Sequence, residues 1–198
     1  MRHNAYHFTK GDRLRDGTKL PPTGTTLKHT GPIKMCSSGL HASRNVWDAL
    51  RYSPGSMLHR VYCSVDLTED NTKLVCRERT IIQTIDAEDV LRKFARMCAL
   101  DVLHLWDAPD VVVEYLKTGD ESIREAANSA ARSAAYYTAN SAAYSAHYAA
   151  YSAAYYAAYY AAYYAADYAA NSAAKKKQKA RLIRMVNRYL KQLEKQGE

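Results

Sequence analysis

The chain has 198 residues, which is enough for one moderate domain and an appendage, and it contains 17 tyrosines but two phenylalanines. Its formal charge of +8 is local, because residues 175–198 hold nine Lys or Arg and two Glu, which leaves the rest of the chain close to neutral. The four cysteines have no paired metal-ligand spacing and follow no secretory signal. We therefore expect no metal site, no cofactor, and buried free thiols in the cytoplasm of a host cell.

The first part of the chain is broken by glycines and prolines up to residue 35, which predicts short strands joined by turns, the first from Ala5 to Thr9. Asn45 can cap a short helix that Pro54-Gly55 ends. From Met57 to Leu67 apolar and polar residues alternate, which predicts a half-buried strand.

Two further strands are expected at Lys73 to Cys76 and Thr80 to Thr84. Residues 1–85 are thus predicted to form a small mixed α+β head. In residues 86–119, Asp86 caps an amphipathic helix whose buried side runs to Leu105, and a second helix begins at Pro109 and ends at Gly119. These two helices are expected to pack against each other or the head.

Residues 120–174 form a region rich in alanine and tyrosine with a period of four, and they predict a long α-helical stalk. Tyr155, Tyr159 and Tyr163 lie on one ridge of such a helix, beside a groove of alanine pairs. Two such helices, within one chain or in two chains, can interdigitate at a crossing angle of about −50°. We expect a homo-oligomer formed through this ridge. A spacer without a partner is the alternative, and a membrane span is disfavoured because tyrosine prefers the bilayer interface.

Residues 175–198 predict a separate basic amphipathic helix. Its apolar stripe, which includes Leu182, Val186 and Tyr189, must pack on the head or on a second copy, so these residues join the predicted oligomer contact. Its basic flank is an alternative nucleic-acid site that would neutralise phosphates, formed by Lys175, Lys176, Lys177, Lys179 and Arg181.

The segment SSGLHAS, followed by VWDALRYSPGSML and HRVYCSVDL, carries a resemblance. It is similar to an uncharacterised family of small phage-encoded and prophage-encoded proteins with a central GLHAS motif, some of which end in alanine-rich repeats. The resemblance covers residues 1–105 and implies a phage accessory protein, with no known reaction.

The head also resembles, more weakly, ADP-ribosyltransferase-like domains. That resemblance would place His7 on the first strand, Ser43 at the turn, and Glu78 as the residue that polarises a nicotinamide glycosidic bond. The sequence departs from the pattern, because the Ser-Thr-Ser type motif is missing and Glu78 lies between two arginines.

These observations favour a non-enzymatic accessory protein whose head binds a nucleotide-like ligand or a host protein in a counter-defence role. Arginines and a tyrosine on strand faces suit phosphate and base. The expected ligand-binding residues are His41, Ser43, Arg60, Tyr62, Arg77 and Arg79. Two alternatives stay open: an ADP-ribosyltransferase-like enzyme that uses His7 and Glu78, and a structural or nucleic-acid-binding protein that uses the basic C-terminal helix.

Overall fold

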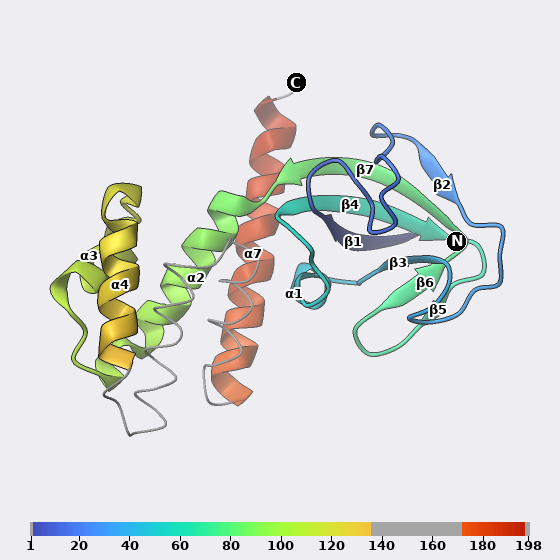
Figure 1. The fold of residues 1–198 in the computed structure, drawn as a ribbon. Coiled ribbons are helices and arrows are strands. Elements are labelled where there is room, and N and C mark those ends of the chain that lie inside the picture. The colour runs from blue at the N-terminus through green and yellow to red at the C-terminus, as the bar shows by residue number, and fades with distance from the viewer. Residues whose placement is uncertain (1, 136–171, 197–198) are drawn as a thin grey trace. The chain divides into compact units, whose positions relative to one another are not determined.

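The fold was obtained as a computed structural model that describes residues 2–135 and 172–196 (Figure 1). The chain forms two compact units, residues 1–87 and residues 88–198. The described residues contain two antiparallel sheets and five α-helices, which confirms the mixed α and β class. The greater part of the predicted Ala/Tyr stalk, from residue 136 to residue 171, lies outside the described residues.

The first unit contains both sheets (Figure 1). The four-stranded sheet has the order β1-β4-β7-β2, and its strands are β1 (His3–Thr9), β4 (Met57–Ser64), β7 (Glu78–Asp86) and β2 (Thr26–Lys28). The three-stranded sheet has the order β3-β6-β5, and its strands are β3 (Leu40–Ala42), β6 (Leu74–Cys76) and β5 (Thr68–Glu69). The predicted strands at residues 5, 57, 73 and 80 therefore all exist, with boundaries shifted by a few residues.

One apolar cluster joins the two sheets. The larger sheet contributes Ala5, Val61, Cys63 and Ile81, and the smaller sheet side contributes Ala42, Leu74 and Cys76. Side chains alternate along a strand, and directly opposed residues of an antiparallel pair share a face. Because Ala5 opposes Val61 and His7 opposes His59, both histidines lie on the face of the sheet that bears this cluster.

A backbone bridge connects the sheets at one edge. Tyr6 and Ser43 exchange two hydrogen bonds, with N–H to O distances of 2.8 and 2.9 Å. The helix α1 (Val46–Leu50) follows directly, and the Asn45 side chain accepts a hydrogen bond from the Asp48 amide as its N-cap, as the sequence predicts. Consequently α1 packs beside β1.

The predicted strand from Met57 to Leu67 is too long. β4 ends at Ser64, because Val65 and Asp66 both have positive φ angles, 59° and 46°, which no strand accommodates. This turn leaves Val65 exposed and places the Asp66 carboxylate against Arg77, with a distance of 2.7 Å from Nε to Oδ2.

The described residues of the second unit, 88–135 and 172–196, form helices and short connections. They contain α2 (Glu88–Val102), a 3₁₀ turn (Leu103–Leu105), α3 (Asp110–Thr118), a second 3₁₀ turn (Glu121–Ile123), α4 (Arg124–Ala135) and α7 (Ser172–Gln196). The prediction that the first helix buries Leu105 is wrong, because α2 ends at Val102 and Leu105 is exposed. The second helix ends at Gly119 as predicted, with φ of 72° at that residue.

In this unit α7 packs against α2, and α3 packs against α4 (Figure 1). Leu182 and Val186 of α7 are fully buried within the single chain, which accounts for the apolar stripe without a second copy, and their role in an oligomer contact stays a prediction. Tyr189 of the same predicted set is half-buried.

The apolar stripe of α7 instead contributes to a core within the unit, where Leu190 is also buried. The alternative nucleic-acid site includes Arg181, whose guanidinium forms a bidentate pair with the Asp101 carboxylate, at 2.8 and 3.1 Å. Lys175, Lys176 and Lys177 are exposed and Lys179 is half-buried.

None of the helices in residues 2–135 and 172–196 has the length and apolar character that crossing a bilayer requires.

Candidate functional site

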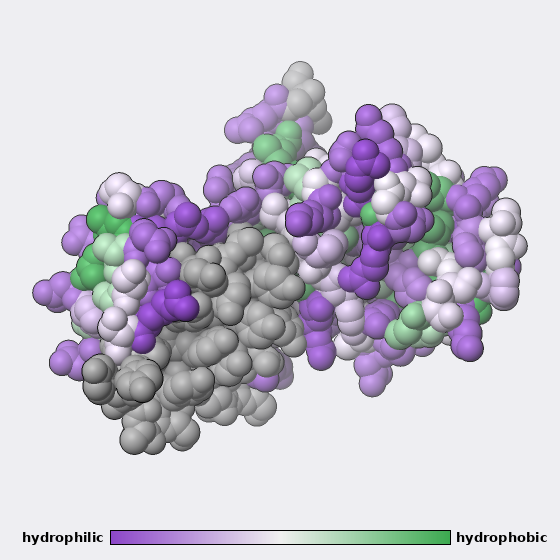
Figure 2. Space-filling view, viewed as in Figure 1, coloured by the Kyte–Doolittle hydropathy of each residue, from purple (hydrophilic) through white to green (hydrophobic). Residues whose placement is uncertain are grey.

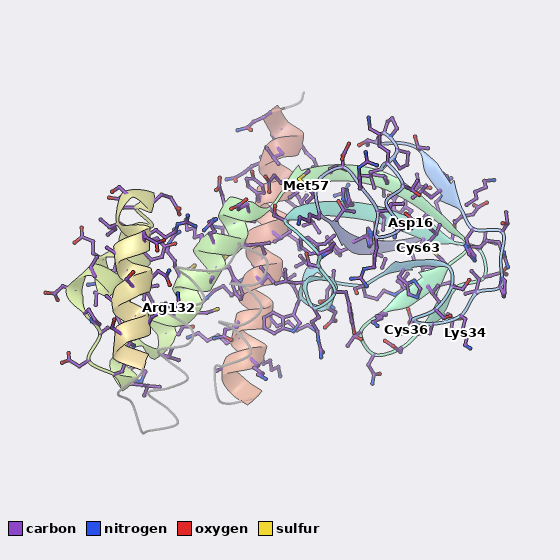
Figure 3. The ribbon with its side chains drawn as sticks, viewed as in Figure 1. Asp16, Lys34, Cys36, Met57, Cys63 and Arg132 are labelled. Carbon is purple, nitrogen blue, oxygen red and sulfur yellow. The ribbon has the colours of Figure 1, made fainter. Side chains whose placement is uncertain are left out.

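A cavity of about 600 Å³ opens in the first unit. Its walls come from β1, the loop that follows β1, the loop before β3, β3 itself and the end of α1. Figure 3 labels Asp16 and Cys36, which line the cavity from the loop after β1 and the loop before β3. The surface of the first unit is mixed in character in Figure 2, and the cavity is lined by both apolar and polar side chains.

The glycine of the GLHAS motif is required by close packing. Gly39 has a φ of 111°, and a Cβ added there would lie 2.5 Å from Val75 Cγ2 and 3.1 Å from Ile33 Cδ1. Any other residue would therefore push the loop away from β6 and widen the cavity.

The histidine of the motif holds the loop closed. His41 Nε2 accepts a hydrogen bond from the Cys36 amide at 3.0 Å, so its Nδ1 carries the proton and donates to the Gly39 carbonyl at 3.1 Å. Burial lowers the pKa of His41, and the bond to Gly39 opposes part of that effect. His41 is thus a neutral ring at the cavity wall, with both nitrogens engaged.

Arg79 is the unusual residue of the site. It opposes Cys63 in the register of β4 and β7, so its side chain lies on the inner face of the sheet and is only 3% exposed. Its Nη1 donates to the His41 carbonyl at 2.6 Å, while Nε is buried without a partner. No described carboxylate forms an ion pair with it. Burial lowers the pKa of Arg79, and the Asp16 carboxylate opposes part of that effect without forming an ion pair. An arginine remains charged, so the cavity wall holds a buried cation with no direct ionic partner among the described residues.

Two histidines beside Arg79 are neutral. His59 Nε2 is 2.8 Å from Thr9 Oγ1, and that hydroxyl donates its proton to the Gly11 carbonyl, so His59 Nε2 must donate and Nδ1 must accept from Thr84 Oγ1. Burial lowers the pKa of His59 to about 4.

His7 lines the cavity itself, and its ring centroid lies 6.1 Å from that of His59. Burial, followed by the charge of Arg79, lowers the pKa of His7 well below its usual value. A neutral imidazole offers one donor and one acceptor, which suits recognition of a polar ligand group.

The rest of the wall is cationic and aromatic. Lys73 Nζ lies 4.0 Å from the centroid of the Tyr52 ring, and Arg15 Nη2 donates to the Tyr52 carbonyl at 3.3 Å. Asp16 accepts a hydrogen bond from the Thr18 amide at 2.9 Å, and this bond lowers its pKa. Among the described lining residues, three permanent cations therefore face one carboxylate.

The structure brings together part of the predicted site. His7, His41, Ser43 and Arg79 all line the cavity. Since the sequence separates them by up to 72 positions, only the bridge between β1 and β3 and the pairing of β4 with β7 bring them to one place.

The other predicted residues do not line the cavity. Arg60 and Tyr62 alternate with the buried residues of β4 and lie on its opposite face. The Arg77 guanidinium pairs with Asp66 and donates to the carbonyls of His29 and Gly31. Glu78 pairs with Lys28 at 3.2 Å. Arg60, Tyr62, Arg77 and Glu78 are therefore not part of the candidate site.

The lining residues that the sequence did not predict include Arg15, Cys36, Tyr52 and Lys73. They lie in loops and at the end of a helix, where no periodic signal exists.

The prediction that all four thiols are buried is wrong for Cys36. Cys63, Cys76 and Cys98 are buried, but Cys36 is exposed in the turn before β3. Within residues 2–135 and 172–196 no group of three or more His, Cys, Asp or Glu side chains is placed to hold a metal ion.

Comparison with known proteins gives one match. Residues 5–93 match the family described as a domain of unknown function, DUF7666. No curated protein and no solved structure matches the chain. The matched span includes every residue of the cavity wall, so the family and the cavity coincide in the first unit.

Proposed function

We propose that the first unit is a binding module for a small anionic, nucleotide-like ligand, and that Arg79 is the residue that binds the anion. The unpaired, buried guanidinium of Arg79 carries this proposal. Removing an ion from water costs several kcal/mol in a protein interior unless a partner compensates for it. A phosphate group that accepts from Nε and from the free face of the guanidinium would supply that compensation.

The remainder of the cavity fits the rest of such a ligand. A volume of about 600 Å³ lies within the range of small-molecule sites. Lys73 and Arg15 add positive charge, the neutral ring of His7 offers a donor and an acceptor, and the partly exposed ring of Tyr52 offers an aromatic surface. Sequestration of a nucleotide signal, the counter-defence role that the phage resemblance implies, would use a cavity of this kind.

Neither alternative is supported by a specific contact. An ADP-ribosyltransferase-like reaction needs a carboxylate beside the ligand, and Glu78 lies outside the cavity and is paired with Lys28. In the basic helix, Arg181 is paired with Asp101, so its guanidinium is engaged within the chain and is not available to bind a phosphate of nucleic acid. The binding module is therefore the proposal that the contacts favour.

We also propose that the chain self-associates through the tyrosine ridge of Tyr155, Tyr159 and Tyr163, which lies outside the described residues. The support is the period of four in the sequence, because rows of residues four apart form the ridges of a helix surface. Replacing all three by glutamate should convert the oligomer to a monomer in sedimentation. An unchanged sedimentation coefficient would contradict the proposal.

Calorimetric titration tests the binding module. The full chain is titrated at low salt with pyrophosphate, ADP and adenosine, and we expect binding of the two anions but not of adenosine, with ADP tighter than pyrophosphate. Arg79→Met should abolish binding. Arg44→Met is the matched control, because Arg44 is exposed, pairs with Glu69 and lies outside the cavity, so binding should stay within about two-fold. Equal binding by the Arg79 variant and the wild type would refute the proposal.

A further inference from the structure

Cys36 differs from the other three cysteines of the chain in its surroundings. It is exposed at the cavity wall, whereas Cys63, Cys76 and Cys98 are buried. Burial raises the pKa of Cys98 to about 12, and a hydrogen bond to Cys76 together with burial raises the pKa of Cys63. Among the four cysteines, a folded chain therefore offers a single accessible thiol to a reagent in solution.

A lysine is aimed at this sulfur. Lys73 Nζ donates to Cys36 Sγ at 3.1 Å, across 37 positions of the sequence. The lysine is held in place at both ends: its amide donates to Asp70 Oδ1 at 2.7 Å, and its ammonium lies over the Tyr52 ring. The hydrogen bond from the lysine to the sulfur raises the pKa of Lys73, so the lysine stays charged. A fixed ammonium beside a sulfur attracts an anionic reagent to that sulfur.

The backbone presents the sulfur in one orientation. Cys36 has a φ of 61°, in the left-handed region, and its amide is bonded to His41 Nε2. For a residue that is not glycine this conformation costs about 1 kcal/mol, and the turn from Lys34 to Ser38 maintains it.

An independent observation points to an anion at the same place. Arg79 is buried, its Nε has no partner, and it shares the cavity wall with Cys36. His41 contacts both residues, since its ring accepts from the Cys36 amide and its carbonyl accepts from Arg79 Nη1. A negatively charged reagent that enters the cavity thus meets Lys73 at the sulfur and Arg79 elsewhere on the same cavity wall.

We infer that Cys36 is a site of thiol–disulfide exchange with small anionic disulfides, and that Lys73 is its positioning residue. The Cys36 thiolate attacks one sulfur of the disulfide. A new bond forms between Cys36 and that sulfur, the original S–S bond breaks, and the second half leaves as a thiolate that takes a proton from water. Cys36 is oxidised and the leaving half is reduced, so the disulfide itself is the oxidant.

The adduct would occupy the mouth of the cavity and exclude the ligand. This consequence rests on the proposed function, whereas formation of the adduct does not. Exchange at Cys36 is accordingly a redox control of binding: the reduced chain binds the anionic ligand, and the mixed disulfide does not.

Intact-mass spectrometry of the folded full chain tests the exchange. The probes are glutathione disulfide, which is anionic, and cystamine, which is cationic, and each rate is divided by the rate of the same probe with N-acetylcysteine amide. We expect one adduct per chain and none in Cys36→Ser. The normalised rate should be at least about five-fold higher for the anionic probe, since even in water a charge at 4 Å contributes about that factor.

Two lysine variants separate positioning from general charge. Lys73→Met should remove the preference for the anionic probe, whereas Lys34→Met should keep it, because Lys34 lies in the same turn but outside the cavity wall (Figure 3). Equal normalised rates for the two probes in the wild type, or an unchanged preference in the Lys73 variant, would overturn the inference.

The dependence on ligand binding is tested separately. Pyrophosphate is titrated into the wild type, the glutathione adduct and Cys36→Ser. We expect binding to the wild type and the serine variant and at least about ten-fold weaker binding to the adduct. If the adduct forms but none of the three binds pyrophosphate, the proposed function fails and the exchange site stands. If the adduct binds as well as the wild type, the redox control is refuted.

Discussion

Replacing Arg79 by methionine should raise the stability of the first unit while it abolishes binding of an anion. The guanidinium is 3% exposed, is bonded to the His41 carbonyl and has no described carboxylate partner. Desolvation of one ion costs several kcal/mol, and a hydrogen bond from a charged donor returns about 1.5–3 kcal/mol. Methionine fills a similar volume without a charge. We therefore expect the free energy of unfolding of this unit to rise by about 1–2 kcal/mol.

The assay is a urea titration followed by tryptophan fluorescence. Trp47 in α1 and Trp106 in the second unit are the two tryptophans of the chain, so a Trp106→Phe background reports the first unit alone. In the same background, pyrophosphate at about 100 times its dissociation constant should stabilise the parent by about 2.7 kcal/mol and the methionine variant not at all. A variant that loses more than about 2 kcal/mol, or that is still stabilised by pyrophosphate, would show that Arg79 has a structural role and refute the reasoning.

Three further variants test the fold. His59, with its pKa near 4, binds a proton in the unfolded chain but not in the folded unit between about pH 6.5 and 4, so it should contribute a loss of about 3 kcal/mol as the pH falls through that window. The lowered pKa of His7 acts in the same direction, so His59→Gln should reduce, without removing, the fall of urea midpoints with pH. Asp101→Asn weakens the bidentate pair with Arg181 and should destabilise the second unit by about 1 kcal/mol in thermal unfolding. Gly119→Ala places a Cβ on a residue with φ of 72°, within 2.3 Å of the Arg96 guanidinium. The free energy of unfolding of the second unit should fall by about 1–2 kcal/mol. An unchanged melting temperature would contradict this prediction.

The elements with a local cause were predictable from the sequence. Asn45 caps α1 and Gly119 ends α3 because each needs only its immediate neighbours. Alternation from Met57 located β4, but its end was missed, since the positive φ angles of Val65 and Asp66 depend on the tertiary pairing of Asp66 with Arg77. Local signals thus predicted the existence of most elements, while tertiary contacts determine where they stop.

The candidate site was predictable only in part, for a related reason. Arg77 and Arg79 are two positions apart and look equivalent in the sequence, but Arg79 lies within β7 and faces inward while Arg77 precedes the strand and is satisfied by carbonyls. The contact between Cys36 and Lys73 joins two loops that no periodicity relates. Only the three-dimensional pairing of the strands brings such residues together.

Native mass spectrometry of the full chain, purified gently from the cells that express it, tests the binding module most directly. We expect a small extra mass on each wild-type chain that corresponds to an anionic, phosphate-bearing molecule, and its absence from Arg79→Met prepared in parallel. A wild-type chain with no added mass, and with none gained after incubation with ADP or pyrophosphate, would contradict the assignment of the cavity as an anion-binding site.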